Sequence, residues 1–537
     1  MFAYSIESNT PVQDTIFWSQ QALAAVAPGL LTPFSFSVLA EIARRSWYNY
    51  YDRLGFEPRP GRHLLRQHNG RAYLNLSISA QIEAERAGVE PLAFWLNDQL
   101  TPLAVKPKSG LLAAFKTGRN QKRISTLLNE LATELTQIEQ RARTWHAKTQ
   151  ELRWSQAEIL QVMEEIERVG ADSLMTFLAA RHNIMLLYNR AYQLLRAESH
   201  NAASWEQTKT ALGRADTLHE LDIARQIAEM GGALRSAPTT EPALATMAQT
   251  ATWAEWRLAL PEGALKSALT TFFTQYGQRC ALEGELALPR WLEAPASVIE
   301  ALQAAATGDA ATFQAVDAQP LPSLLQNQLA AGAQKQLAQW QQEAAALHAL
   351  QSRALHAFSY IQAGTRTWAL AAAKEAMSDG RLTSPEDVFY FDLEEIKQMM
   401  TGEWNISSTA EIHATTAERK AQYQAWRDAA SSPLLVGNAA AMSVHTLASA
   451  PDMPSVISLN PTRTIPAPAI IDPPRFIHVE QLSTGDAIFL QVANGFIVDT
   501  ETALDPIVVA AQHYGRQIFN APSVHRNGVG GPDVGLN

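Results

Sequence analysis

The stretch FFTQYGQRCALEGELALPRW, residues 272–291, concentrates the polar chemistry of a chain that is otherwise rich in alanine and leucine. Arg279 and Glu283 are four residues apart, so in a helix they would share one face and could pair or jointly bind a polar ligand. Arg290 follows closely, and Gly277 allows the backbone to bend just before Arg279. Two interpretations stay open, a structural ion-pair network at a helix end and a ligand-binding site.

The composition is that of an ordinary globular protein with several domains. The chain has 537 residues, of which 47% are hydrophobic and 18% charged, and this length exceeds one small core. Its 43 basic and 53 acidic residues give a net charge of −10 without a basic block, which argues against nucleic acid as a partner. The N-terminus lacks the pattern of a signal peptide, and no run of about 18 apolar residues appears. We therefore expect a cytoplasmic protein without a membrane partner.

The chain has a single cysteine, Cys280. One cysteine excludes an intramolecular disulfide and a zinc site built from several cysteines, and we expect no metal site. Beside Arg279, Cys280 could act as a thiolate nucleophile, but no histidine lies close in sequence to activate it. A buried structural cysteine is the simpler interpretation.

Three separate motifs resemble the phosphoenolpyruvate-utilising enzymes, the group of phosphoenolpyruvate synthase and rifampicin phosphotransferase. The central stretch is similar to the family's YGHR…E…PRW signature, with Gln278 at the position of the family's histidine. Residues 70–77, GRAYLNLS, resemble the family's GRxYLNLS, and residues 380–396 resemble its GrLxxpeDvFyLtxdEl segment. The motifs occur in the family's order, so the resemblance implies the family's helical substrate-binding fold.

Helical periodicity dominates the chain before residue 430. Residues 121–235 repeat apolar side chains at helical spacing, and Ser155 with Glu158 forms a capping-box sequence. Residues 355–377 predict another helix, which ends at Gly380. These patterns predict a mainly α protein.

A polar triplet, Arg181, His182 and Asn183, interrupts one of the apolar helical runs. Helix bundles place ligand sites among such residues, so the triplet could line a pocket. The alternative is that its members face solvent or satisfy neighbouring carbonyl groups.

The C-terminal part predicts a small domain that follows a linker. Residues 431–475 are rich in proline and serine and read as the linker. Residues 487–493 and 496–498 then read as two strands joined by a hairpin-type turn. Pro506 begins a helix with Asp505 as its N-cap. This β/β/α unit resembles the swivelling phosphohistidine domain of the family.

The family's phosphohistidine motif, about TGGxxSHAAIVAREYG, is altered at its acceptor. Aligned on Tyr514, this chain has Asp505 in place of the serine and Pro506 in place of the histidine. Proline has no nucleophilic side-chain atom, so the family's chemistry cannot be assigned to this chain. Asp505 at a helix N-terminus and His513 at its end are weaker acceptor candidates. N-capping and an interaction with the helix dipole account for them without chemistry.

We therefore predict a multidomain, mainly α protein. It would have a helical substrate-binding body over residues 1–430, a linker over residues 431–475 and a swivelling-like domain over residues 476–537. Whole enzymes of the family carry an ATP-grasp domain before this segment, and no glycine-rich phosphate loop appears in the sequence. The expected function is a substrate-binding or scaffold subunit without autonomous phosphoryl transfer. It would bind no cofactor by itself and would use Mg-ATP or phosphoenolpyruvate through a separate ATP-grasp partner.

Other functions stay open, and so does the question whether the chain is an enzyme. It could be the active transferase half of a split ATP- or phosphoenolpyruvate-dependent phosphotransferase, or a lyase or hydrolase that reuses the helical pocket. Arg279, Glu283 and Arg290 would then hold an anionic group of a small-molecule substrate, and a carboxylate would act as base. A plain interaction module is the third possibility, and it would have no ligand-sized pocket between its helices.

Overall fold

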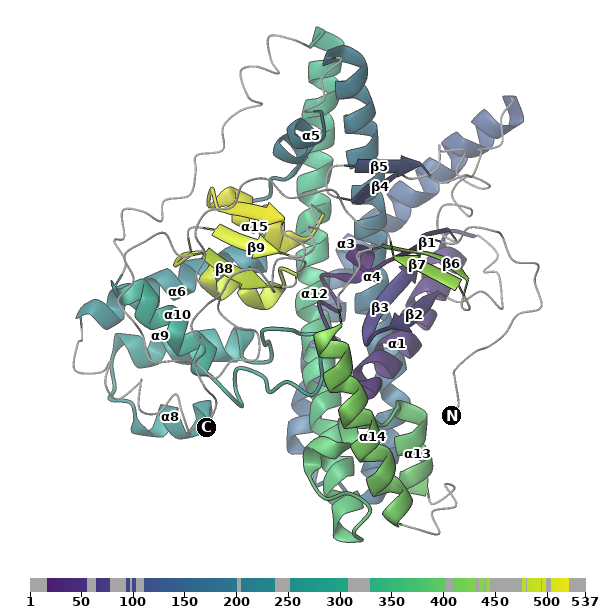
Figure 1. Ribbon diagram of the computed structural model, residues 1–537. Helices are drawn as coiled ribbons and strands as arrows, with labels where there is room; N and C mark the ends of the chain where they lie inside the picture. The colour runs from purple at the N-terminus through teal and green to yellow at the C-terminus, as the bar shows by residue number, and fades with distance from the viewer. Residues whose placement is uncertain are drawn as a thin grey trace.

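The computed structural model describes residues 17–55, 64–77, 93–96, 99–102, 111–199, 204–236, 252–307, 329–401, 409–429, 434–438, 441–444, 476–479, 481–493, 495–498 and 504–520. These residues form a mainly helical protein, which confirms the predicted class (Figure 1). No helix among them is long and apolar enough to cross a membrane.

The helices vary widely in length. In chain order they are α1 (Pro33–Arg53), α3 (Leu111–Glu151), α4 (Gln156–Ser199), α5 (Ser204–Leu212), α6 (His219–Ser236), α8 (Trp253–Ala259), α9 (Ala264–Tyr276), α10 (Ala296–Thr307), α12 (Ala331–Ser378), α13 (Leu393–Thr401), α14 (Thr409–Asp428) and α15 (Pro506–His513). Short 3₁₀ helices are η1 (Gln21–Leu23), η3 (Pro385–Tyr390) and η4 (Thr484–Phe489).

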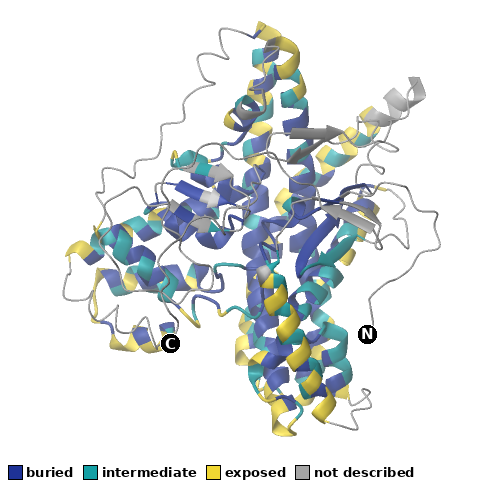
Figure 2. Cartoon of the chain, viewed as in Figure 1, coloured by how far each residue is buried: buried dark blue, intermediate teal, exposed yellow. Residues whose placement is uncertain are grey.

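A bundle of α1, α3, α4 and α12 forms the first core. Its interior is dark blue in Figure 2 because apolar side chains recur at helical spacing on the facing sides. Trp368 of α12 is fully buried, and its indole Nε1 donates to the carbonyl oxygen of Ile159 on α4 at 2.7 Å. The predicted capping box at the start of α4 is present, because the Ser155 amide donates to Glu158 at 2.7 Å.

A five-stranded sheet lies beside this bundle. Its strands are β1 (Phe17–Ser19), β2 (Leu65–His68), β3 (Arg71–Asn75), β6 (Leu434–Asn438) and β7 (Ala441–Val444), in the order β2-β3-β1-β6-β7. Strand β1 pairs antiparallel with both β3 and β6. Strands β6 and β7 lie within residues 431–475, so the start of the predicted linker pairs with the N-terminal strands. The domain boundaries themselves stay a prediction. A separate hairpin consists of β4 (Ala93–Leu96) and β5 (Gln99–Pro102).

The C-terminal unit contains a three-stranded parallel sheet. Its strands are β8 (Phe476–Val479), β9 (Gly495–Val498) and β10 (Gln517–Asn520), in the order β10-β9-β8. The strand predicted at residues 487–493 and its hairpin are wrong, because η4 covers residues 484–489 and β8 pairs with β9 in parallel. Ser483 and Asp486 form a capping box that starts this helical turn, and an apolar run buried on every side gives no periodicity to reveal it.

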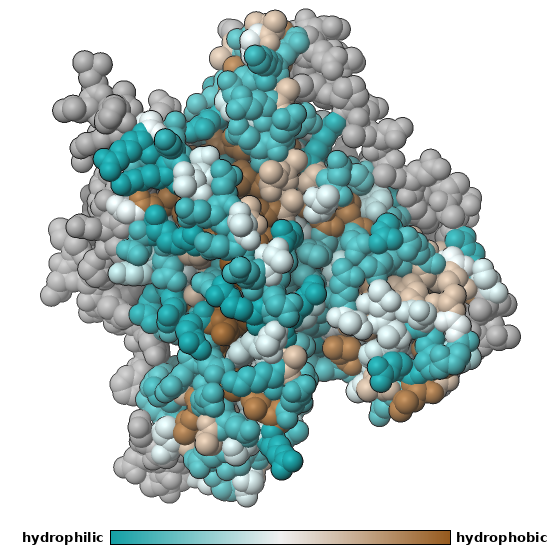
Figure 3. Space-filling model, turned by 180° about the vertical axis from the view of Figure 1, so that it is seen from behind, coloured by the Kyte–Doolittle hydropathy of each residue, from teal (hydrophilic) through white to brown (hydrophobic). Residues whose placement is uncertain are grey.

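This C-terminal unit shares a second core with α6, α8, α9 and α10. Phe272 and Trp291 lie in the same buried cluster as Ile488 and Val508. Figure 1 shows the two groups together on one side of the long bundle. On the opposite view, exposed hydrophobic side chains are scattered among hydrophilic ones (Figure 3). The identity of the unit as a swivelling domain stays a prediction.

Candidate functional site

Residues 277–292 form a loop that folds back on itself after α9. The helix ends at Tyr276, and a side chain at Gly277 would place its Cβ 2.4 Å from the Leu292 side chain. The Trp291 amide donates to the Arg279 carbonyl oxygen at 2.8 Å. Arg279 therefore does not lie on a helical face with Glu283. The two side chains still pair at 3.0 Å, and the fold of the loop brings them together.

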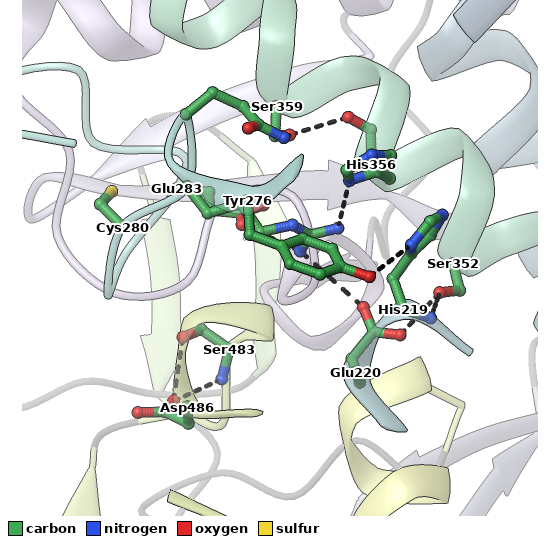
Figure 4. Close-up of polar contacts among 12 residues, drawn as sticks. His219, Glu220, Tyr276, Cys280, Glu283, Ser352, His356, Ser359, Ser483 and Asp486 are labelled. Atoms are coloured by element: carbon green, nitrogen blue, oxygen red, sulfur yellow. Dashed lines mark hydrogen bonds and ion pairs between the residues drawn. The ribbon is translucent and has the colours of Figure 1, made fainter. Parts of the chain in front are cut away.

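Arg279 is fully buried and contacts polar side chains from three segments of the chain, and Figure 4 labels its neighbours Glu220, Glu283 and His356. Its Nη1 donates to Glu283 at 3.0 Å and lies 3.9 Å from Glu220 of α6, while Nη2 lies 3.4 Å from His356 Nδ1 on α12. Burial alone would lower the pKa of Arg279, but Glu283 and Glu220 outweigh it and raise that pKa. The guanidinium is therefore charged inside the protein.

Two histidines stack beside this arginine. The rings of His219 and His356 lie 4.0 Å apart at 25°, and Tyr276 donates to Asp222 at 2.6 Å while contacting His219 Nδ1 at 3.2 Å. Burial, followed by the charge of Arg279, lowers the pKa of His219 to about 3. Burial also lowers the pKa of His356 well below its usual value, so both rings are neutral at neutral pH.

The partners of His356 fix its tautomer. An arginine has only donors, so His356 Nδ1 must accept from Arg279, and the neutral ring carries its proton on Nε2. That Nε2 is buried and has no hydrogen-bond partner among the described residues. His356 therefore presents a free donor inside the cluster.

Arg290 is a second buried guanidinium in the same loop. Its Nη1 donates to the Cys280 sulfur at 2.7 Å and to the Glu283 carbonyl oxygen at 3.2 Å. Within the described part of the chain, its Nε and Nη2 have no hydrogen-bond partner, and no carboxylate pairs with it. Burial raises the pKa of the Cys280 thiol, so Cys280 is a protonated, structural cysteine in this environment.

The cluster contains further unsatisfied atoms. Glu220 Oε2 accepts from Ser352 at 2.6 Å, but Oε1 has no hydrogen bond within the described residues, and neither does Arg279 Nε. Burial raises the pKa of Glu220 although Arg279 opposes this. Buried polar groups are almost always hydrogen-bonded, so these atoms need water or a ligand.

Glu285 of the same loop has a structural role. Its carboxylate accepts from the Thr32 amide at 2.6 Å, from the Thr32 hydroxyl at 2.9 Å and from Ser35 at 2.8 Å. These contacts fasten the loop to the start of α1. Gln278, at the position of the family's histidine, donates to Ser359 of α12 at 3.2 Å.

The C-terminal unit covers the loop. A side chain at Gly485 would place its Cβ 2.1 Å from the Cys280 carbonyl oxygen, so the two backbones are in close contact. Ser483 donates to the carbonyl oxygen of Ala281, and Figure 4 shows Ser483 and Asp486 on the side of Cys280. A ligand could reach the cluster from this side only if the unit moved away.

The two candidate phosphate acceptors, Asp505 and His513, do not belong to the Arg279 cluster. Asp505 is fully buried and pairs with Arg181 of α4, whose Nη2 also donates to the Gln21 carbonyl oxygen at 2.6 Å. Asp505 is the N-cap residue of α15, as predicted, but its carboxylate makes no cap hydrogen bond and serves the ion pair instead. Pro506 is the buried first residue of α15, and His513 is its partly buried last residue.

The polar triplet of α4 is likewise occupied by structural contacts. Arg181 belongs to the ion pair, and Asn183 donates to the Ala179 carbonyl oxygen at 2.8 Å. His182 lies 6.0 Å from the Tyr50 ring, centre to centre. None of the three faces solvent, but Arg181 and Asn183 do satisfy neighbouring carbonyl groups, as the structural alternative expected.

Local sequence patterns missed the side chains that α6 and α12 contribute, namely His219, Glu220, Ser352 and His356. A signal exists on α12, where His348, Ser352 and His356 recur every four residues within an alanine-rich helix. No three metal-ligating side chains converge anywhere in the described residues.

Residues 173–362 match the family model described as the rifampicin phosphotransferase fourth domain. The match begins in α4, ends in α12 and includes Arg279, Glu283 and Arg290. It supports a phosphoenolpyruvate-utilising, phosphotransferase-like family for this part of the chain. No curated protein matches the chain.

Proposed function

We propose that this protein is a ligand-binding subunit of the phosphotransferase-like family that does not transfer a phosphoryl group by itself. The acceptor position is the observation that carries the proposal. Pro506 replaces the family's histidine, and the neighbouring Asp505 is fully buried in an ion pair with Arg181. A carboxylate held in this way is poorly placed to attack phosphorus, because attack would leave Arg181 without its partner.

The ligand-binding part of the proposal rests on Arg279 and Arg290. Both guanidiniums are buried, and together they leave three N–H-bearing atoms without an acceptor among the described residues. Arginine binds carboxylate and phosphate oxygens through paired N–H groups, and a buried cation without an anion is costly. A small molecule with a carboxylate or phosphate group supplies the missing acceptors.

Nothing in the described residues argues for Mg-ATP bound by the chain itself. Glu283 pairs with Arg279, and no three metal-ligating side chains converge among the described residues. We therefore derive no step through Mg-ATP. The resemblance to the family suggests a separate ATP-grasp subunit as the source of any phosphoryl transfer.

The intact mass of the chain tests the acceptor. The purified protein is incubated with Mg-ATP or with phosphoenolpyruvate, each with and without an ATP-grasp protein encoded nearby. We expect no gain of a phosphate under any condition. A gain that disappears in Asp505→Asn or His513→Ala, or phosphorylation of a small molecule by the chain alone, would overturn the proposal.

Titration with inorganic phosphate and phosphoenolpyruvate tests the ligand site. We expect both anions to raise the melting temperature of the wild-type protein. Arg290→Met should abolish this rise, whereas Arg225→Met, which removes a half-exposed arginine of α6, should keep it. Equal responses of the two variants would exclude Arg290 as the anion ligand.

A second function, an active enzyme, is favoured by one arrangement. His356 holds a neutral ring with a free Nε2 donor, and Glu220, with its raised pKa, lies near Arg279 on the opposite element. A neutral imidazole and a carboxyl group with a raised pKa beside an anion site suit proton transfer. If a partner reconstitutes an activity, Arg279→Ala should abolish it, and retention of that activity would exclude this site.

A further inference from the structure

Two helical elements of the C-terminal unit, η4 and α15, pack directly against the helical body. The first contacts α6 and α10, and the second contacts α6 and α12. Phe489 of η4 and Val508 of α15 are at most 2% exposed and belong to the same buried cluster as Phe272 of α9. Domains move relative to one another by default unless the interface between them is large and apolar. A shared apolar core therefore favours a unit that stays in place.

At the loop of residues 277–292 the unit approaches so closely that only a glycine fits. A Cβ at Gly485 would lie 2.1 Å from the Cys280 carbonyl oxygen and 2.7 Å from the Ala281 Cα, and both are backbone atoms. Ser483 donates to the Ala281 carbonyl oxygen beside this contact. Backbone atoms cannot adapt by changing a rotamer, so this contact fits one position of the unit only.

Contacts outside this loop also hold the unit. Asp505 pairs with Arg181 of α4, and both side chains are buried. The Gly29 amide, between η1 and α1, donates to Gln481 at 3.3 Å. Moving the unit away would break the ion pair and expose the shared apolar core at the same time, and the cost of exposure grows with the apolar area.

We propose that the C-terminal unit is a permanent wall of the candidate site and stays on the loop of residues 277–292 throughout the life of the folded protein. The resemblance to the family implies a swivelling domain at this place, so the unit has a different role in this chain. Because the contacts join protein atoms alone, this role does not depend on the anion site. A ligand of the proposed anion site would enter from another side of the loop.

Thiol labelling of the full chain with a maleimide tests the wall. Ser483→Cys in a Cys280→Ser background places the chain's one thiol at the contact, because the Ser483 side chain is fully buried and touches the loop. This thiol should react only when the unit leaves the loop or the chain unfolds. We expect labelling without urea to be at least about a thousandfold slower than in the urea-unfolded chain. Half-labelling should occur at the urea concentration that removes half of the helical circular-dichroism signal.

Two glycine variants in this background form a matched pair. Gly485→Ala inserts a methyl group against the carbonyl oxygen of residue 280, and it should raise the labelling rate without urea by at least about tenfold. Gly232→Ala places the same methyl group on α6, where nothing lies within 4 Å, and it should leave the rate unchanged. Rapid labelling of Ser483→Cys in the folded protein, or an unchanged rate in Gly485→Ala, overturns the wall.

The wild-type protein gives a second measurement without a substitution at the contact. Its Cys280 is 2% exposed and should likewise be labelled only on unfolding. Inorganic phosphate should not speed labelling of either protein. An acceleration by phosphate would show that the unit opens for a ligand, which overturns the wall and leaves the anion site standing. Slow labelling in a protein that binds no phosphate would remove the anion site and leave the wall.

Discussion

Arg181 and Arg290 are both buried arginines, yet their surroundings differ in kind. Arg181 pairs with Asp505 and donates to a backbone carbonyl oxygen, so its charge is balanced within the fold. The hydrogen bonds of Arg290 go to the Cys280 sulfur and to a carbonyl oxygen, and no carboxylate among the described residues balances its charge. The ion pair of Arg181 links the C-terminal unit to α4, whereas two nitrogen atoms of Arg290 have no acceptor among the described residues.

This difference separates a structural ion pair from a binding site. A buried pair contributes to the fold mainly because loss of one partner leaves the other charge uncompensated. A buried arginine without a carboxylate lowers stability, so its presence is better explained by a ligand. We therefore propose a structural role for the region around Pro506 and a ligand-binding role for the loop of residues 277–292.

The largest effect is expected for Arg181→Ala. The substitution leaves the Asp505 carboxylate buried without its cation, and we expect the free energy of unfolding to fall by about 3 to 5 kcal/mol. Urea unfolding at neutral pH measures this loss. Arg44→Ala removes a mostly exposed arginine that pairs with Glu41, and it should cost about 1 kcal/mol or less. Equal losses in the two variants would contradict a fastening role for Arg181.

An intermediate loss of stability is expected on acidification, because the buried His348 lies close to the ion pair of Arg181 and Asp505. Burial and then the charge of Arg181 lower its pKa from 6.5 to about 3. Below the unfolded pKa the unfolded chain binds a proton that the folded protein does not, so stability is lost as the pH falls from 6.5 toward 3. At about pH 5 this histidine should lower the free energy of unfolding by about 2 kcal/mol.

Urea unfolding at neutral pH and near pH 5 measures this dependence. His348→Phe should reduce the difference between the two conditions by about 2 kcal/mol, while His413→Phe, a change in a surface contact of α14, should not. His219, whose pKa is also about 3, adds a loss of the same sign that remains in both variants. An unchanged pH dependence in His348→Phe would mean that another group carries it.

The smallest effect is expected for Arg290→Met in the absence of ligand. The long apolar side chain fills similar space, and no buried carboxylate loses its partner. We expect the free energy of unfolding to stay within about 1 kcal/mol of wild type or to rise. A loss as large as that of Arg181→Ala would show that Arg290 is needed by the fold, and the contrast between the two arginines would disappear.

Local rules predicted the parts of the fold that depend on near neighbours. The helix of residues 355–377 lies within α12, the capping box of Ser155 is present, and Gly380 with φ of +79° ends its helix as expected. The strand expected at residues 487–493 failed because a fully buried apolar run has no period that separates a strand from a helical turn.

Sequence reasoning found only the part of the candidate site that lies within one short stretch of the chain. Arg279, Glu283 and Arg290 lie in one stretch, and their residue types alone point to an anion. Glu220 and His356 come from other helices, so the sequence around Arg279 does not indicate that they lie beside it. For Asp505 the local prediction was incomplete. Its place before Pro506 indicated an N-cap, but in the structure its carboxylate pairs with the distant Arg181.

The sequence by itself determined the helical class and the capped helix starts, since these depend on residue types and on contacts within a few positions. Only the tertiary structure decided which charges are balanced. Arg181 and Asp505 are 324 residues apart, and Arg279 and His356 are 77 apart. Periodicity and capping act over about one helical turn, whereas a buried ion pair forms where packing brings distant elements together.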